Sequence, residues 1–324
     1  MESVWMEKAS ISRDSVLNEK MAAVIENVEK VIIGKRQSIE LLLVAMLTGG
    51  HVLIEDVPGV GKTQMVSSVA HSCQGKFNRL QLTPDVMPSD ITGFVMINPT
   101  TRESEFRPGA VFCNFLLADE INRASPKTQS ALLEIMEEGH MTMEGVTYQL
   151  PKPFMVLATQ NPVETYGTYH LPEAQMDRFL LKISMGYPAK EDELAILNRD
   201  VHAVPENLMP VISCEDVEEL KEQVLQIRCD ERIAEYIVRI AEETRNSEFI
   251  RLGASPRASL ALYKACKAYA LLNGRSYVLP DDVKALAPYV LAHRLMLSPK
   301  GKTMMETPEN ALRQILDTVA VPTV

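Results

Sequence analysis

The chain has 324 residues, of which 46% are hydrophobic and 23% are charged, and its formal net charge at pH 7 is −10. This length allows two domains with sizeable cores, and this composition is ordinary for a globular protein rather than a disordered one. The acidic balance disfavours a dedicated duplex-binding protein, which usually presents a basic face to the phosphates.

Targeting and redox signals favour a cytoplasmic protein. The first residues include acids and no apolar stretch, so they do not resemble a secretory signal. The longest apolar run, residues 41–47, is far shorter than the ~20 residues of a membrane span. The five cysteines are widely spaced without a C-x-x-C pair, which is typical of reduced thiols rather than a disulfide framework or a zinc site.

The hydrophobic pattern changes near residues 186–215. Before this region, short β-like apolar runs alternate with helical patterns, which indicates α/β architecture with a mostly parallel sheet. After it, apolar residues recur at helical spacing in four successive segments. We therefore predict an α/β domain over 1–203 and a helical domain over 204–324. The helix at 255–274 has the clearest ends, with Ser255 as N-cap and Pro256 at its first position.

The segment EDVPGVGKT, residues 55–63, ends like a phosphate-binding loop. An apolar strand precedes it and a helix follows, which is the context that such a loop needs. Backbone N–H groups and the helix dipole can then converge on phosphate oxygens. The first glycine of the G-x-x-x-x-G-K-[ST] template is replaced by Asp56. Because Asp56 precedes the tight part of the turn, we expect this replacement to change flexibility at the entrance rather than the donors.

The loop therefore predicts a nucleotide site, with a chance Gly-Lys-Thr turn as the alternative. Lys62 can reach the β- and γ-phosphates, and the Thr63 hydroxyl can bind Mg²⁺. The predicted binding residues of this loop are Asp56, Val57, Pro58, Gly59, Val60, Gly61, Lys62, Thr63 and Gln64.

Two acids end the apolar segment NFLLADE, residues 114–120. We expect this strand to lie next to the phosphate-loop strand, with Asp119 holding Mg²⁺ and Glu120 polarising a water for attack on the γ-phosphorus. Two acids could also be a solvated strand end. Their place after the loop, with a strand at 77–83 between them, favours the functional interpretation.

A third buried-type strand, FMVLATQN at 154–161, ends in polar residues. Asn161 could orient the attacking water between the acids and the γ-phosphate. An Asn before Pro is also a common turn former, so the spacing alone leaves both interpretations open.

Together these segments resemble the MoxR family of AAA+ ATPases. The similarity extends from about Val31 to about Ser298. The segments that carry it are EDVPGVGKT, QLTPDVMPSDITG, FRPGAVFCNFLLADEINRASPKTQSALLEIMEEG, ATQNPVETYGTYHLPEAQMDRF and GASPRA.

The resemblance implies an AAA+ αβα sandwich with five parallel strands in the order 5-1-4-3-2, followed by a helical lid. It implies an insert in the second core helix at 93–110 and a hairpin at 139–153. The alternating sequence MTMEGVTYQL supports that hairpin independently.

The resemblance also assigns further site residues. Asn161 is similar to the family's polar sensor, Arg178 to the arginine that reaches a neighbouring subunit's γ-phosphate, and Arg257 to the lid's sensor arginine. Residues 31–35, with Ile33 and Gly34, match the segment that lines the adenine pocket. From the residues alone, Arg178 could pair with Asp177 or a helix end, and Arg257 could be a solvated helix residue.

The function implied is ATP hydrolysis with Mg²⁺ in a homo-oligomeric ring, expected to be a hexamer, that remodels or matures a partner protein or metalloenzyme complex. A von Willebrand factor A domain protein is an expected partner. The alternatives are a chelatase-type motor subunit, a nucleotide-gated binding module and, ranked low, a nucleic-acid translocase. A translocase would be expected to carry basic residues at the tip of the hairpin at 139–153. The arms of this hairpin have no Lys or Arg, which is why this alternative ranks low.

Overall fold

The computed structural model describes residues 18–57, 59–100, 102–161, 168, 169, 171–198 and 205–322. Internal contacts divide the chain into two compact units, one of residues 23–220 and one of residues 18–22 with 221–322. The division falls within the helix α9 (Cys214–Gln226). The boundary predicted at residues 203 and 204 lies outside the described residues.

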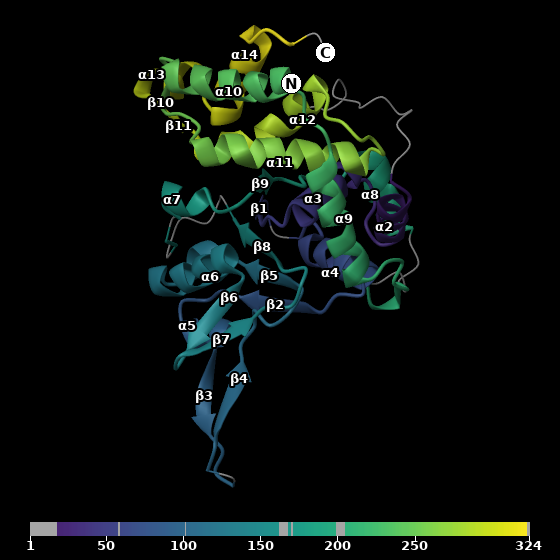
Figure 1. The fold of residues 1–324 in the computed structure, drawn as a ribbon, viewed down its shortest axis with the longest axis vertical. Helices are drawn as coiled ribbons and strands as arrows, with labels where there is room; N and C mark the ends of the chain where they lie inside the picture. Colours follow the sequence, from purple (N-terminus) through teal and green to yellow (C-terminus); the bar gives the residue numbers. More distant parts are fainter. Residues whose placement is uncertain are drawn as a thin grey trace. The chain divides into compact units, whose positions relative to one another are not determined.

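The α/β unit is built on a five-stranded parallel sheet in the order β2-β5-β8-β1-β9 (Figure 1). Numbered along the chain, these five strands give the predicted order 5-1-4-3-2. Their bounds are β1 (Val52–Glu55), β2 (Phe77–Gln81), β5 (Phe115–Asp119), β8 (Met155–Gln160) and β9 (Leu181–Ile183). The three inner strands are buried, which explains their nearly continuous apolar sequences.

One expectation about this sheet was wrong. The strand that ends in the two acids, β5, does not pair with the phosphate-loop strand β1, because β8 lies between them and pairs with both. Both strands are equally apolar and buried, so hydrophobicity did not indicate which of them lies beside β1.

The helices of this unit confirm the alternation read from the sequence. The apolar run 41–47 belongs to a buried helix, α3, and no helix in the described part of the chain is long and apolar enough to cross a bilayer. The helices, with the short 3₁₀ turns, are α2 (Glu19–Glu29), α3 (Arg36–Thr48), α4 (Lys62–Ser72), α5 (Pro88–Thr92), η1 (Ile121–Arg123), α6 (Pro126–Glu138), α7 (Glu173–Met176), α8 (Lys190–Leu197), η2 (Pro205–Asn207) and α9.

The insert expected at 93–110 forms a hairpin, and the hairpin expected at 139–153 is also present. The first joins β3 (Gly93–Ile97) to β4 (Ser104–Pro108), and the second joins β6 (His140–Met143) to β7 (Val146–Gln149). The second turns at Glu144-Gly145, where both residues have positive φ, as a tight hairpin requires. The first hairpin follows α5, but residues 109–114 return to β5 without a helix, so helical structure flanks this insert only on its N-terminal side.

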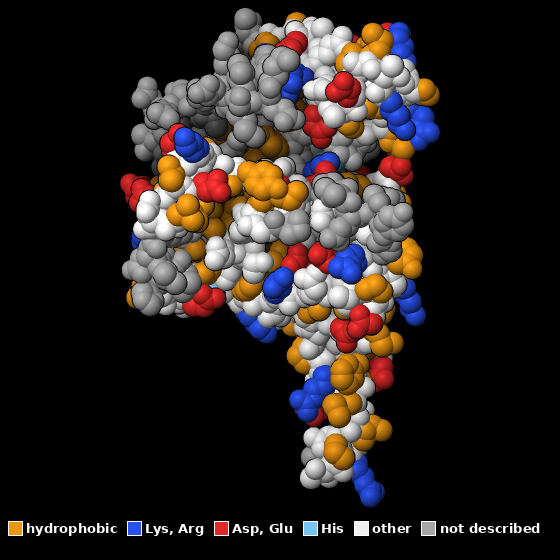
Figure 2. All heavy atoms as spheres, turned by 180° about the vertical axis from the view of Figure 1, so that it is seen from behind, with side chains coloured by type: hydrophobic (Ala, Val, Ile, Leu, Met, Phe, Trp, Pro, Cys, Tyr) orange, Lys and Arg blue, Asp and Glu red, His pale blue; other side chains and the backbone are white. Residues whose placement is uncertain are grey.

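Aromatic contacts join the two hairpins. The rings of Phe106 on β4 and Tyr148 on β7 stack with centroids 4.1 Å apart, and Phe112 meets Phe106 edge-on at 5.4 Å. The β3–β4 hairpin extends away from the sheet (Figure 1). Hydrophobic side chains gather along it (Figure 2), and among them Phe94 and Ile97 are at least half exposed.

The second unit is mainly helical, as predicted for the C-terminal part of the chain. Its elements are α10 (Glu231–Asn246), β10 (Ile250–Leu252), α11 (Pro256–Leu272), α12 (Pro280–Leu291), η3 (Ala292–Arg294), β11 (Met296–Leu297), α13 (Pro299–Met304) and α14 (Pro308–Thr318). The predicted start of α11 is confirmed, because the Ser255 hydroxyl accepts a hydrogen bond from the Ala258 amide at 3.1 Å.

A buried histidine fastens β1 to its surroundings. His51 accepts a hydrogen bond from the Val156 amide at Nδ1, and its Nε2 therefore donates to the Met136 carbonyl. Burial lowers the pKa of His51 to about 4, because the charged ring would lose its hydration. The neutral imidazole is thus a structural link between β1, β8 and α6.

We expect His51 to make stability depend on pH. Its folded-state pKa lies below the ordinary value of ~6.5, so the unfolded chain binds the proton more readily. The stability that the neutral His51 contributes to the fold is complete above about pH 6.5. It is lost as pH falls toward 4, and the loss amounts to at most about 3 kcal/mol. In denaturant unfolding of the wild type and His51→Gln, the wild type should lose more stability over this range. A difference between the two proteins that stays constant with pH contradicts the assignment.

Candidate nucleotide site

The loop between β1 and α4 has the shape of a phosphate cradle. Gly59 and Gly61 have φ of 86° and 89°, a left-handed conformation that glycine adopts without strain. A Cβ added at either glycine would meet nothing within 4 Å, so this side of the loop faces open space. Gly61 is the N-cap of α4 and provides no capping side chain, which leaves the first helical N–H groups suited to bind an anion.

The functional side chains of the loop lie at its C-terminal end. The Lys62 ammonium donates to the Asp56 carbonyl at 3.0 Å, which folds this side chain back over the loop. Thr63 is half-buried, and Gln64 is exposed beside a cavity of about 470 Å³. Val57 and Val60 are half-buried, and Pro58 lies outside the described residues.

Asp56 has a task that the sequence did not suggest. Its side chain is buried, and its carboxylate accepts hydrogen bonds from the Ser184 hydroxyl and the Gly186 amide, each at 3.1 Å, and from the Met185 amide. These donors belong to the segment that follows β9. The residue in place of the first template glycine therefore fixes a neighbouring segment, and the expectation that it only alters flexibility was incomplete.

A single hydroxyl connects the two acids at the end of β5. Thr159 on β8 donates to Asp119 Oδ1 at 2.5 Å and accepts from the Glu120 amide at 2.9 Å. The second oxygen of Asp119 pairs with Arg79 from β2 at 2.7 Å. The orientation of both acids therefore depends on the strands on either side of β5.

Glu120 has an unusual backbone. Its φ and ψ of 57° and 53° lie in the left-handed region, which a non-glycine residue occupies at a penalty of about 1–3 kcal/mol. The Thr159 hydroxyl and the Arg123 amide, which donates to the Glu120 carbonyl at 2.9 Å, hold this conformation. The Glu120 carboxylate is partly exposed and pairs with Arg123 at 2.9 Å. A strained, partly exposed acid at the edge of a sheet is typical of a functional residue.

The polar row continues across the sheet. Gln160 on β8 donates to Glu55 on β1 at 2.6 Å, and Glu55 pairs with Lys182 on β9 at 2.5 Å. Asn161 follows β8 directly and is 8% exposed. All five strands are parallel, so these side chains lie at one edge, the usual place for a ligand in such a sheet.

Ile33 and Gly34 form the turn before α3. Gly34 has φ of 72°, and a Cβ there would lie 2.1 Å from Asp192 Oδ2 on α8. The positive φ favours glycine at this position, and the predicted adenine-binding turn packs directly against the Asp192 side chain in the first turn of α8.

The two predicted arginines lie in different units. Arg178 follows α7 and is bound within its own chain, where it donates to the Leu133 carbonyl at 2.6 Å and pairs with Glu137 at 3.3 Å. Arg257 is exposed in the first turn of α11 in the helical unit. Their proposed roles stay predictions.

Sequence reasoning missed three side chains at this edge. They are Arg79, Arg123 and Thr159. Each becomes visible only through its partner on another element or across a tight turn, and the sequence carried no signal beyond a polar residue near a strand or helix end.

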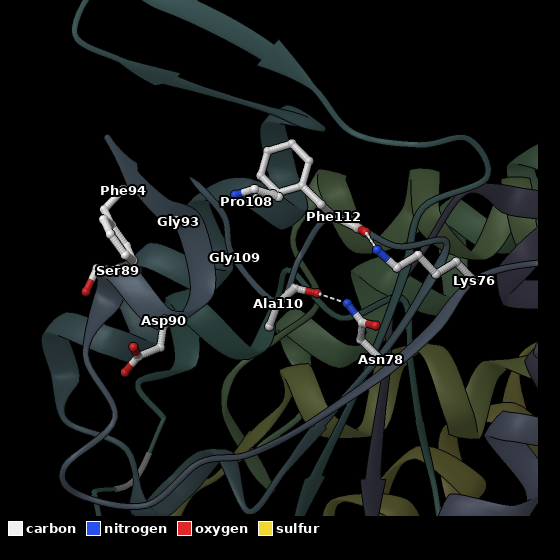
Figure 3. A pocket seen from close by; sticks show the side chains of 10 residues that line it. All are labelled: Lys76, Asn78, Ser89, Asp90, Gly93, Phe94, Pro108, Gly109, Ala110 and Phe112. Atoms are coloured by element: carbon white, nitrogen blue, oxygen red, sulfur yellow. Dashed lines mark hydrogen bonds between the residues drawn. The ribbon is translucent and has the colours of Figure 1, made fainter. Parts of the chain in front are cut away.

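A different pocket lies at the base of the projecting hairpin (Figure 3). It has a volume of about 430 Å³, and none of its lining residues belongs to the predicted nucleotide site. Two side chains line this pocket from the β2 side (Figure 3). Lys76, just before β2, donates to the Phe112 carbonyl, and Asn78, on β2, donates to the Ala110 carbonyl, each at 2.8 Å.

Comparison with known proteins agrees with this geometry. Residues 51–181 match the ATPase family associated with various cellular activities (AAA), and residues 242–315 match the AAA lid domain. The chain is 52% identical to YeaC of Bacillus subtilis (strain 168), named an uncharacterized protein, over 94% of this chain and 96% of YeaC.

Two further comparisons decide the family. The chain is 43% identical to Chaperone MoxR1 of Mycobacterium tuberculosis (strain ATCC 25618 / H37Rv), over 93% of this chain and 82% of that protein. The crystal structure of a putative ATPase from Cytophaga hutchinsonii ATCC 33406 superposes with a TM-score of 0.87 and 39% identity, over 94% of this chain and 95% of that one. The chain belongs to the MoxR family of AAA+ ATPases. As a MoxR-family protein it is an ATP hydrolase, with a P-loop α/β core and a helical lid.

The bridging hydroxyl of Thr159 generates a test within this MoxR-family site. Thr159→Val keeps the side-chain shape but removes the link between Asp119 and the Glu120 amide. We expect ATP affinity to change little and kcat to fall about 10- to 100-fold, the usual range for residues that orient functional groups. Steady-state hydrolysis and equilibrium nucleotide titration measure the two effects separately.

Thr159→Ser keeps the hydroxyl and serves as the matched control. It should retain most of the activity. Wild-type kcat in Thr159→Val contradicts the proposed orienting role.

Proposed function

We propose that this chain forms a homo-oligomeric ring, a hexamer, that uses ATP hydrolysis to remodel or mature a partner protein or metalloenzyme complex. The observation that carries this proposal is the combination of an open glycine loop with a row of polar side chains along the adjacent sheet edge. The name of the relative MoxR1, a chaperone, supports the remodelling role. The projecting β3–β4 hairpin, with exposed apolar side chains, offers a surface for contact with a partner.

ATP and Mg²⁺ fit the residues present. The open side of the loop offers backbone N–H groups to the phosphates, with Lys62 at its end. Thr63 and Asp119 supply a hydroxyl and a carboxylate oxygen, the hard ligands that Mg²⁺ prefers, and they would hold the ion. When bound, Mg²⁺ neutralises charge on the phosphates. Ile33 and Gly34 would contact the adenine base.

Glu120 would take a proton from the attacking water. Its carboxylate is partly exposed, and its backbone is fixed by Thr159, so a water at the edge could meet a preoriented base. Asn161 would form a hydrogen bond with the same water and orient it for attack.

The two predicted arginines would complete the site. Arg178 would stabilise charge in a neighbour's transition state after leaving its partners on α6. Arg257 would act from the lid. A von Willebrand factor A domain protein remains the expected partner, and a chelatase-type motor subunit remains the second candidate. A nucleic-acid translocase is disfavoured, because β6 and β7 contain no Lys or Arg.

Glu120→Gln tests hydrolysis and partner retention together. The amide keeps size and polarity but does not take up the proton, so we expect normal ATP affinity and turnover reduced about 10²- to 10⁴-fold. With ATP bound and hydrolysis blocked, the variant should also retain a partner protein that the wild type releases. Nucleotide titration, phosphate release and affinity capture in ATP measure these three effects.

Glu134→Gln is the matched control, since Glu134 is an exposed acid on α6 of the same unit. It should behave as wild type in all three assays. Near-normal turnover in Glu120→Gln would require another base.

A contribution of Arg178 in trans makes hydrolysis a property of the interface between subunits. Such an arginine contributes ~10³–10⁵ in rate and little to ground-state affinity. Specific activity should rise with protein concentration, and Arg178→Ala should bind ATP but hardly hydrolyse it. Mixing Arg178→Ala with Lys62→Ala subunits should restore activity, because one has an intact loop and the other supplies the arginine.

The control is Arg232→Ala, which removes an exposed arginine paired with Asp230 in the helical unit. It should leave activity unchanged. Activity independent of concentration, without rescue on mixing, shows that Arg178 does not act between subunits.

A further inference from the structure

A short segment after β9 is held from one side by a lysine. The Lys35 ammonium donates to the carbonyl oxygens of Met185, Gly186 and Tyr187 at 2.6, 3.0 and 3.0 Å. A lysine has three N–H donors, and all three have an acceptor in one segment. Lys35 thus makes a geometrically complete set of bonds to the backbone of residues 185–187.

Asp56 binds the same segment through its donors. Its carboxylate accepts from the Ser184 hydroxyl and from the amides of Met185 and Gly186. The opposite charges of Lys35 and Asp56 therefore meet across the backbone of 184–187. Burial of its ammonium lowers the pKa of Lys35, and the negative charges of Asp56 and Asp192 oppose this shift by favouring the charged form. We call residues 184–187, with Lys35 and Asp56, the clamp.

The clamp connects two parts of the nucleotide site that are distant in sequence. Asp56 is the first residue of the phosphate loop, and Lys35 follows Gly34 in the turn proposed to bind the base. The same stretch of chain continues into α8, whose Asp192 packs against Gly34. The distance between phosphate cradle and base turn is therefore set through residues 184–192 as well as through the sheet.

A purely structural role for these charges is the competing explanation. Buried charges stabilise a fold little, because desolvation offsets most of their attraction. Charge-assisted hydrogen bonds do define position more strictly than apolar packing, since they need short distances and fixed angles. Six bonds that converge on one segment between two binding elements favour a positioning role.

We propose that Lys35 and Asp56 are positioning residues that hold the base-binding turn at a fixed distance from the phosphate cradle, so that the base contributes to nucleotide affinity. This inference rests on the proposed binding of the base at Ile33 and Gly34. Loss of the clamp leaves the phosphate-binding amides of residues 59–63 in place and releases the base turn.

Binding of ATP and of inorganic tripolyphosphate, which lacks a base, separates the two elements. Both dissociation constants are measured by calorimetry without Mg²⁺, so that hydrolysis does not interfere, for the wild type, Lys35→Met and Asp56→Asn. We expect ATP affinity to fall about tenfold or more in both variants, the effect of one or two lost charge-assisted hydrogen bonds. Tripolyphosphate affinity should stay within about twofold of wild type, as loop amides are unchanged.

Two controls keep the test decisive. Lys267→Met removes a lysine that donates to the Leu225 carbonyl at 2.7 Å in the helical unit, and it should bind both ligands as wild type does. Lys35→Arg retains donors to the carbonyls and should recover most of the ATP affinity. If the Lys35→Met protein does not fold, Asp56→Asn carries the test, because it weakens the other side of the same segment.

The outcomes discriminate between the hypotheses. Equal losses for ATP and tripolyphosphate show a general structural role and overturn the proposal, as does unchanged ATP affinity in both variants. A wild-type protein that binds ATP no better than tripolyphosphate shows that the base has no site, which also overturns it. A wild type that binds neither ligand contradicts the proposed function itself.

Discussion

The position of β8 between β1 and β5 is the constraint on which the site depends. This strand pairs with the phosphate-loop strand on one side and with the acidic strand on the other. Its last residues therefore reach both neighbours, Thr159 toward the acids and Gln160 toward Glu55. A shift of β8 by one residue would turn these side chains to the opposite faces of the sheet and remove the hydroxyl that links the Asp119 carboxylate to the Glu120 amide.

The charged groups at the sheet edge have partners within the chain. Lys62 binds a loop carbonyl, Arg79 and Arg123 pair with the two acids, and Arg178 pairs with α6. The arginines are partly exposed, and exposed ion pairs are worth only about 0–1 kcal/mol. A phosphate, a metal ion or a charged neighbour can therefore replace these partners without a large penalty, which suits groups that must exchange contacts during a reaction cycle.

Much of this protein could be predicted from its sequence. The loop between β1 and α4 could be read because its signal is local: glycines, a lysine and a threonine at fixed spacing between a strand and a helix. The start of α11 could be read for the same reason, since an N-cap serine followed by proline acts within one turn. The resemblance to the MoxR family supplied the strand order, whereas the apolar segment that ends in two acids was incorrectly expected to lie beside β1.

The rest depended on contacts between distant residues. Thr159 and Arg79 meet Asp119 from strands 40 residues away along the chain, and nothing in their local sequences indicates this. Asp56 was interpreted as a deviation from a template, because its three donors lie about 130 residues further on. Long-range polar contacts of this kind follow from register and topology, which a single sequence does not specify.

The stacked rings of Phe106 and Tyr148 have a mechanical consequence. They join the projecting β3–β4 hairpin to the β6–β7 hairpin, and the chain leaves β7 directly into β8. Stacked aromatic rings resist sliding because they lose contact area with any lateral movement. A load applied to the projection can therefore reach the base of β8 through this ring pair, in addition to the covalent path through residues 109–114 into β5. The other end of β8 orients the two acids.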